Sequence, residues 1–387
     1  MALLDDIVND EATRQEYFPV VKDRIYMAHA GVSILPKVAG DAIRDFATAS
    51  ELDNQESDEH LALAEETRAV AAELIGAQAL EIALLGPTSV GISLVANGLG
   101  WNPDDEVISY VEDYPANVYP WMNLEPKGVK HVPLKTELPG VITWDLVEGA
   151  ITENTRLVAL ASCNFLSGYR IDIDTIGRNL RERGILFFLD GIQTIGAFPT
   201  SMEHVDFMSA DSHKWMLGPA AAGIFYVRKS LQKELNPTLL GAYNVVTPDF
   251  IAQDKIRYYI GGRRFEPGML NLPGIIGMNA SLKLIRDVGI DAISERLLHL
   301  RQTIVETFKP FGYSPYLDEV EQEAPWKSAI VSLSHPDKDL GELYQKLKQH
   351  KVSVSYRKNR EGQHFIRLSP HFYNTEEEIH RVAELMR

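Results

Sequence analysis

Short apolar runs alternate with amphipathic segments between residues 82 and 229. The apolar runs predict strands at 82–85, 106–110, 129–133, 157–162, 185–190 and 223–229, and the amphipathic segments predict helices at 89–98, 144–152 and 173–183. Residues 157–161 are apolar at every position, as strands are when helices cover both faces of a parallel sheet. The pattern therefore predicts an α/β fold with a large, doubly wound, mostly parallel sheet.

The pattern changes in the last third of the chain. Two long amphipathic helices are expected at 275–287 and 290–308, followed from residue 328 by a strand-helix-strand-strand-helix order. Thr375 and Glu378 have the spacing of a capping box before the last helix. We expect a large domain over residues 17–284 and a smaller α+β domain made of 1–16 and 285–387. The acidic stretch 53–59 is expected to be an exposed loop.

Composition narrows the class of protein. The chain has 387 residues, 45% of them hydrophobic, and a formal net charge of −16 without a Lys/Arg-rich tract. This balance argues against nucleic acid or an anionic membrane as a partner. A single cysteine, Cys163, excludes an intrachain disulfide. No signal segment and no apolar run long enough for a bilayer is found, so a soluble, cytoplasmic enzyme is expected.

The candidate chemistry begins with one lysine and one acid. Lys214 lies in Ser209-Ala210-Asp211-Ser212-His213-Lys214-Trp215, between two predicted strands, and Asp190 ends the apolar run 185–190. Taken alone, Lys214 is a solvated surface amine and Asp190 a helix N-cap. Together they favour a Schiff-base lysine and an acid that keeps a pyridine nitrogen protonated at the carboxyl edge of the sheet.

A second motif joins a strand to a helix. In Gly86-Pro87-Thr88-Ser89-Val90-Gly91, Thr88 and Ser89 would offer hydroxyls and free backbone N–H groups to a phosphate at the positive end of the helix. The alternative is a plain helix N-cap. With Lys214 and Asp190, the motif indicates a site for pyridoxal 5′-phosphate.

These segments resemble the class V aminotransferase family of fold-type I pyridoxal phosphate enzymes, from residue 25 to the final helix. The resemblance implies that Lys214 forms the Schiff base and that Asp190 binds the ring nitrogen. It implies that Gln193 and Asn164 contact the phenolic oxygen and that Ser212 and His213 contact the phosphate. Asp211 departs from the family, which usually has a small neutral residue there. Its side chain is therefore expected to point away from the phosphate.

The resemblance also assigns residues around the substrate. Tyr114 occupies the position of an aromatic residue that stacks on the cofactor ring, although an ordinary core aromatic is the alternative. Arg367 corresponds to the arginine that forks onto the substrate α-carboxylate, although a strand arginine is otherwise mostly a surface residue. Met269 stands where a threonine of the other subunit would touch the cofactor phosphate, so that contact is not carried over. A homodimer is expected.

The sequence restricts the reaction further. Cysteine desulfurases need a thiol on a loop before the carboxylate-binding arginine, and residues 352–367 contain no cysteine. Cys163 is expected to be a small buried hydrophobe. We therefore expect a C–S lyase that eliminates sulfur from a cysteine-derived amino acid, with an epimerase or an aminotransferase as the alternative. No metal site is expected. A non-catalytic pyridoxal or amino-acid sensor on the same fold ranks lower.

Overall fold

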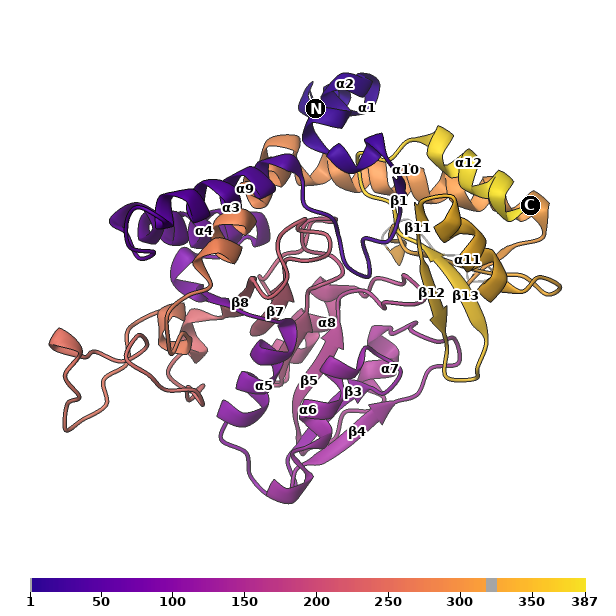
Figure 1. Ribbon diagram of the computed structural model, residues 1–387. Coiled ribbons are helices and arrows are strands. Elements are labelled where there is room, and N and C mark those ends of the chain that lie inside the picture. The colour runs from indigo at the N-terminus through magenta and orange to yellow at the C-terminus, as the bar shows by residue number, and fades with distance from the viewer. Residues whose placement is uncertain (1, 318–325) are drawn as a thin grey trace.

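The computed structural model describes residues 2–317 and 326–387. Its centre is a seven-stranded sheet, seen below the N-terminal helices in Figure 1. Every neighbouring pair of strands is parallel except where β8 is antiparallel to β2 and to β7. In spatial order the strands are β2 (Ile82–Leu85), β8 (Gly223–Val227), β7 (Phe207–Asp211), β6 (Leu186–Asp190), β5 (Thr155–Ala161), β3 (Glu106–Tyr110) and β4 (Lys130–Leu134). The predicted mostly parallel sheet is confirmed.

Alternate residues of the central strands enter two separate hydrophobic cores. In β5, Val158 and Leu160 belong to one core, whereas Leu157 and Ala159 belong to the other. Because successive side chains of a strand point to opposite faces, both faces of the sheet are covered. The covering helices around the sheet include α5 (Thr88–Gly98), α6 (Tyr119–Met122), α7 (Trp144–Glu148) and α8 (Ile173–Glu182). The doubly wound architecture is therefore confirmed, although α7 is shorter than predicted.

A layer of long helices lies beside the sheet (Figure 1). It consists of α3 (Lys37–Ser50), α4 (Asp58–Ile75) and α9 (Leu272–Val288), and the short helices α1 (Ala2–Asn9) and α2 (Glu11–Tyr17) precede it. The prediction of an exposed loop over 53–59 is wrong for its last two residues, because Asp58 and Glu59 form the first turn of α4. Ser57 caps that helix by accepting a hydrogen bond from the backbone N–H of His60. Acidic residues are favourable at this positive end.

The C-terminal part has its own antiparallel sheet and core. The sheet contains, in spatial order, β12 (Ser355–Lys358), β13 (His364–Leu368), β10 (Val331–Ser334) and β9 (Ser314–Pro315). The helices here are α10 (Ile290–Phe308), α11 (Leu340–Gln349) and α12 (Glu376–Met386). The predicted order and the capping box of Thr375 and Glu378 are confirmed.

The N-terminal segment joins this C-terminal part. Strand β1 (Ile25–Tyr26) pairs in parallel with β11 (Val352–Ser353), and Met27 packs in the C-terminal core. The chain then crosses to the large sheet, so residues after Met27 bridge the two sheets. The proposed domain division, 17–284 against 1–16 with 285–387, stays a prediction. None of the helices in 2–317 and 326–387 is long and apolar enough to cross a membrane.

Candidate active site

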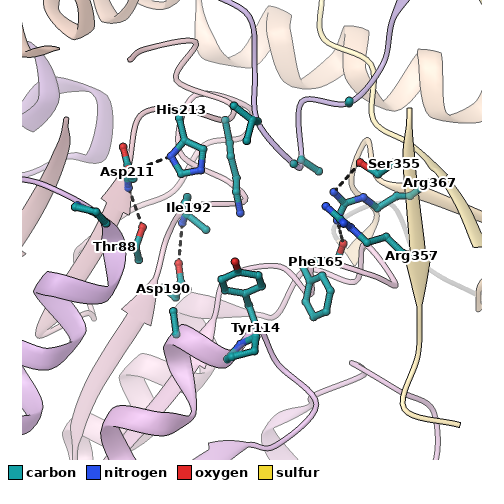
Figure 2. Close-up of a pocket in the computed structure, with 18 of the residues that line it drawn as sticks. Thr88, Tyr114, Phe165, Asp190, Ile192, Asp211, His213, Ser355, Arg357 and Arg367 are labelled. Atoms are coloured by element: carbon teal, nitrogen blue, oxygen red, sulfur yellow. Dashed lines mark hydrogen bonds and ion pairs between the residues drawn. The ribbon is translucent and has the colours of Figure 1, made fainter. Parts of the chain in front are cut away.

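A cavity of about 860 Å³ opens between the carboxyl ends of β6 and β7, the start of α5, and strands β12 and β13. Figure 2 shows Asp190, Asp211 and His213 on one side of it, and Ser355, Arg357 and Arg367 on the other. The carboxyl edge of a parallel sheet is where open α/β folds bind ligands. The volume of the cavity is within the range of small-molecule sites.

Lys214 projects into this cavity from the loop after β7. Its side chain is buried, and its Nζ lies 5.4 Å from the centre of the Tyr114 ring. Burial lowers the pKa of Lys214 to about 8, while the nearby charge of Asp190 acts in the opposite direction. A larger fraction of this amine is therefore neutral near pH 7 than for a lysine in water, which makes it a better nucleophile and proton acceptor.

Asp190 ends β6 at the floor of the cavity. One carboxylate oxygen accepts a hydrogen bond from the backbone N–H of Ile192 at 3.1 Å. Burial raises the pKa of Asp190 to about 6, opposed by that hydrogen bond and by Lys214. A carboxylate held this deeply favours a cationic partner, which would return its pKa towards the ordinary range.

Asp113, which the sequence reasoning missed, supports the same corner. Its carboxylate accepts hydrogen bonds from the backbone N–H of Tyr114 and from the side-chain amide of Asn117. Burial and the nearby Asp190 raise the pKa of Asp113 to about 7. Asp113 shapes the turn that presents Tyr114, and its position directly before that tyrosine was the only signal in the sequence.

The Tyr114 ring closes one side of the cavity. The residue is 51% exposed, and its ring meets Phe165 edge-to-face, with centroids 5.8 Å apart and planes at 77°. The alternative of an ordinary core aromatic is therefore wrong, because the ring lines the cavity instead of packing in the core. Phe165 was not predicted; it follows Asn164 in the turn after β5.

The start of α5 forms a polar corner. Thr88 and Ser89 line the cavity, and the Thr88 hydroxyl accepts a hydrogen bond from the backbone N–H of Asp211 at 2.9 Å. The N-cap residue is Pro87, whose side chain cannot accept hydrogen bonds from the first turn. Backbone N–H groups without an intrahelical partner are therefore available to an anion.

Asp211 lies at the edge of the cavity, and the expectation that its side chain points away from a phosphate stays a prediction. One carboxylate oxygen accepts a hydrogen bond from the backbone N–H of Ala221 and lies 3.0 Å from Nδ1 of His213. The other oxygen is buried without a hydrogen-bond partner among the described residues. The backbone N–H of Ala221 holds the carboxylate at the cavity wall. His213, which lines the cavity, is thus paired with an acid of its own strand-loop segment.

Three residues that were expected to contact the cofactor lie behind the wall of the cavity. The Gln193 amide donates to the Ala30 carbonyl and accepts from the Trp215 indole, and the Ser212 hydroxyl donates to the Pro219 carbonyl. The Asn164 carbonyl oxygen accepts from the backbone N–H groups of Leu166 and Ser167. None of the three is among the side chains that line the cavity. They organise its loops, and their direct contact with a cofactor stays a prediction.

Arg367 approaches from the C-terminal sheet. It is buried on β13, where its guanidinium donates to the Phe165 carbonyl and to the Ser355 hydroxyl. Its Nε is buried without a partner among the described residues. Burial, followed by the nearby charge of Arg357, lowers the pKa of Arg367 to about 9. Arg367 is thus a buried cation at the cavity that lacks a carboxylate partner in the described part of the chain.

Cys163 lies outside the cavity. The thiol is buried beside the Asn164 carbonyl, and burial raises its pKa to about 11. It is therefore protonated at neutral pH, as expected for a small core residue. Within 2–317 and 326–387, no group of three or more His, Cys, Asp or Glu side chains is arranged to hold a metal ion.

Comparison with known proteins agrees with this geometry. The sequence profile of the family described as Aminotransferase class-V matches residues 25–382. A probable cysteine desulfurase of Methanothermobacter thermautotrophicus is 26% identical over 388 residues, covering 95% of each chain. An uncharacterised aminotransferase of Bacillus subtilis, YcbU, is 26% identical over 374 residues and covers 96% of each.

Solved structures share the fold. A cysteine desulfurase of Thermococcus onnurineus superimposes with a TM-score of 0.88 at 22% identity, over 97% of both chains. The cystine C–S lyase C-DES, in complex with cysteine persulfide, gives 0.85 at 22% identity over 95% of this chain and 98% of its own. The chain belongs to the class V aminotransferase family of fold-type I pyridoxal phosphate-dependent enzymes. Its cofactor is therefore pyridoxal 5′-phosphate.

The cavity fits this cofactor. It brings together a buried amine (Lys214), an acid at the end of a strand (Asp190), an aromatic face (Tyr114) and the unpaired N–H groups of a helix start. These are the chemical partners of an aldehyde, a pyridinium nitrogen, a flat ring and a phosphate.

Proposed function

We propose that this enzyme is a C–S lyase that acts on a cysteine-derived α-amino acid by β-elimination. The observation that carries the proposal is the position of Cys163, the only cysteine of the chain, which is buried away from the cavity with a raised pKa. A desulfurase needs a thiolate that can reach the substrate sulfur. Without such an acceptor, the sulfur must leave with its own substituent or as sulfide.

We further propose how the chain holds its cofactor. Lys214 makes the covalent link, Asp190 binds the ring nitrogen and Tyr114 stacks on the ring. Thr88, Ser89, Ser212 and His213 contact the phosphate, and Asn164 and Gln193 contact the phenolic oxygen. When bound, the cofactor receives the electrons released when a bond at the amino acid's Cα breaks. The burial of Asp190 supports its role, because a buried carboxylate is most stable beside a fixed positive charge.

The net reaction takes a thioether amino acid and water to a thiol, pyruvate and ammonium. The Cα proton must be taken up by a base, and the Cβ–S bond breaks with both electrons going to sulfur. Lys214 is the candidate base, because its buried amine has a pKa near 8. Arg367 is proposed to hold the α-carboxylate, since its guanidinium faces the cavity without an acid partner among the described residues.

We also propose that the enzyme is a cytoplasmic homodimer. The acidic composition and the single cysteine support the first part. The second part is supported by apolar side chains that are exposed between β8 and α9, namely Leu239, Leu240, Phe250, Ile251, Ile256, Ile260 and Met269. Exposed apolar surface of this kind usually marks an interface.

The test is a substrate panel with the purified holoenzyme. Cysteine, cystine and S-substituted cysteines should release pyruvate and a sulfur product in equal amounts. Cys163→Ser should retain this activity, and Lys214→Ala should abolish it. Racemised amino acid or a transaminated keto acid without sulfur release would instead favour the epimerase or aminotransferase alternative. Loss of sulfur release in Cys163→Ser, with cofactor bound, would return the desulfurase mechanism.

A further inference from the structure

Two arginines share one face of the C-terminal sheet. In the β12–β13 pairing, Ser355 lies opposite Arg367, and Arg357 follows two residues after Ser355. Because side chains alternate along a strand, Arg357 projects to the same face as Ser355 and therefore as Arg367. All three line the cavity, and Figure 2 shows the two arginines on the side away from Asp211 and His213.

Arg357 has no ion-pair partner in the described part of the chain, whereas several cavity acids are already engaged. Asp211 pairs with His213, and Asp190 lies near Lys214. The charge of Arg357 contributes to the lowered pKa values of both Arg367 and Lys214. One side of the cavity therefore carries two clustered positive charges that no carboxylate of the described residues neutralises.

The two guanidiniums lie at different depths in the wall of the cavity. Arg367 is buried on the central strand β13 and is held by two hydrogen bonds, whereas Arg357 is only partly buried on the edge strand β12. A guanidinium on the edge strand can reach further along a bound ligand, towards its side-chain end. The neighbouring wall is aromatic, with Tyr114 and Phe165 in contact. Such a wall suits a thioether, and a cation beyond it suits an anion.

We propose that Arg357 is a specificity-determining residue that binds a second anionic group on the substrate side chain. The preferred substrates are then cysteine derivatives whose sulfur substituent ends in a carboxylate or another acidic group. This inference rests on the proposed function for the reaction but not for the binding. Arg367 holds the α-carboxylate and Arg357 the distal anion, and the two bonds together orient the Cβ–S bond.

The test compares two isosteric substrates that differ only in charge. S-carboxymethyl-L-cysteine carries a distal carboxylate, and S-carbamoylmethyl-L-cysteine carries a neutral amide of the same size. The wild-type holoenzyme should prefer the acid in kcat/KM by about tenfold or more, as expected for a charge-assisted hydrogen bond. Arg357→Gln should bring the ratio close to one, and Arg357→Lys should keep part of the preference.

Lys358→Gln is the matched control, because it removes one exposed positive charge from the adjacent residue of the same strand, which faces away from Arg357's side. It should retain the wild-type ratio. An equal loss on both substrates in Arg357→Gln would overturn the proposal, since it would mean that Arg357 shares the α-carboxylate or only supports the fold. A wild-type ratio near one would overturn it as well.

A binding measurement tests this inference independently of the proposed reaction. Both compounds are titrated into the holoenzyme while the absorbance of the bound cofactor is followed. If neither compound releases pyruvate, the lyase proposal fails, yet the ratio of the two dissociation constants still tests Arg357. A ratio of about tenfold in favour of the acid, lost in Arg357→Gln, supports the inference. Equal dissociation constants contradict it. The measurement on the wild type alone decides the case if the variant does not fold.

Discussion

At the scale of single residues, burial controls the chemistry of this site. Asp190 and Asp113 have raised pKa values and Lys214 a lowered one, and in each case burial is the largest cause. Each group is thereby shifted towards its neutral form until a partner of opposite charge arrives. Shifts of this kind concentrate at active sites, and here they surround one cavity.

The pKa of Lys214 predicts how the cofactor-free protein takes up pyridoxal phosphate. Only the neutral amine attacks an aldehyde, and burial places the pKa near 8. The rate of reconstitution should therefore rise with pH through about 8 and then level off. Stopped-flow absorbance from about pH 6 to about pH 10 measures this, since the range brackets the lowered pKa and ends near the ordinary lysine value of about 10.4. A rate that still climbs at the upper end would mean that the amine is solvated.

The sequence predicted which side chains reach the cavity better than it predicted the contacts that those side chains make. Lys214, Asp190, Tyr114 and Arg367 all reach the cavity, because each follows or occupies a strand whose direction the apolar pattern had indicated. The contact of the Asp211 carboxylate could not be predicted, since its hydrogen-bond donor, the backbone N–H of Ala221, meets it only in the folded chain. No feature of the sequence indicated a role for Arg357, because the segment 352–367 stands out only for its lack of a cysteine.

At the scale of elements, α5 and β7 build one corner together. The Ser209 hydroxyl of β7 donates to the Thr88 carbonyl, and the Thr88 hydroxyl accepts from the Asp211 backbone. Such close packing requires Gly91, since a Cβ there would collide with the Ser209 side chain and lie 2.9 Å from the Phe225 ring. The start of α5 is thus fixed against β7, the strand that precedes Lys214.

Gly91→Ala should therefore weaken both the fold and the cofactor site. Overpacking of this kind costs about 1–3 kcal/mol, and a displaced α5 moves its N–H groups away from the phosphate. Denaturant unfolding and the dissociation constant of pyridoxal phosphate measure the two effects. Gly100→Ala is the control, because a Cβ there has nothing within 4 Å. Equal behaviour of the two variants would show that α5 does not need this contact.

Arg367, on strand β13, should affect the binding of the substrate and not the binding of the cofactor. Arg367→Ala should raise KM strongly but leave cofactor binding nearly intact, because the guanidinium is proposed to hold the α-carboxylate. Removing one partner of a buried charge pair costs about 2–5 kcal/mol. Steady-state kinetics and cofactor content test this. Arg367→Lys keeps the positive charge but loses the two parallel donors of the guanidinium. Its KM should lie between those of the wild type and Arg367→Ala. Unchanged affinity for the amino acid in Arg367→Ala would assign the carboxylate to another residue.

The strands were more predictable than the helices. Strands apolar on both faces, such as β5, stand out because the surrounding chain is amphipathic. The helices α3 and α4 were not predicted, although α4 is eighteen residues long. Its buried residues include Thr67 and Arg68 as well as alanines, so that its covered face does not form a simple apolar stripe. The contacts with α9 that bury this face are distant in sequence.

At the scale of the whole molecule, the cavity depends on contact between the two sheets. The buried His371 of the C-terminal part donates from Nε2 to the Trp215 carbonyl, directly after Lys214, while its Nδ1 accepts from the Phe372 backbone. Burial lowers the pKa of His371 to about 4, so the ring stays neutral near pH 7. This contact holds Lys214 and Arg367 in a fixed relation, which supports a shared role in binding one substrate.

The segment between β8 and α9 extends away from the rest of the chain (Figure 1) and predicts the oligomeric state. The protein should be a dimer by light scattering, and Ile251→Asp with Ile256→Asp should shift it towards monomer, because both side chains are exposed and apolar. Leu138→Asp, an exposed leucine elsewhere in the chain, is the control. A wild-type monomer, or a dimer that the double variant leaves unchanged, would contradict the proposed interface.

The central claim is that Lys214 is the residue that carries the cofactor. Borohydride reduction of the holoenzyme, followed by proteolysis and mass spectrometry, tests it most directly. We predict that the purified protein is yellow, that reduction fixes pyridoxal phosphate on the peptide containing Lys214, and that Lys214→Ala yields no fixed adduct. An adduct on another lysine, or one retained in Lys214→Ala, would contradict the assignment of the site.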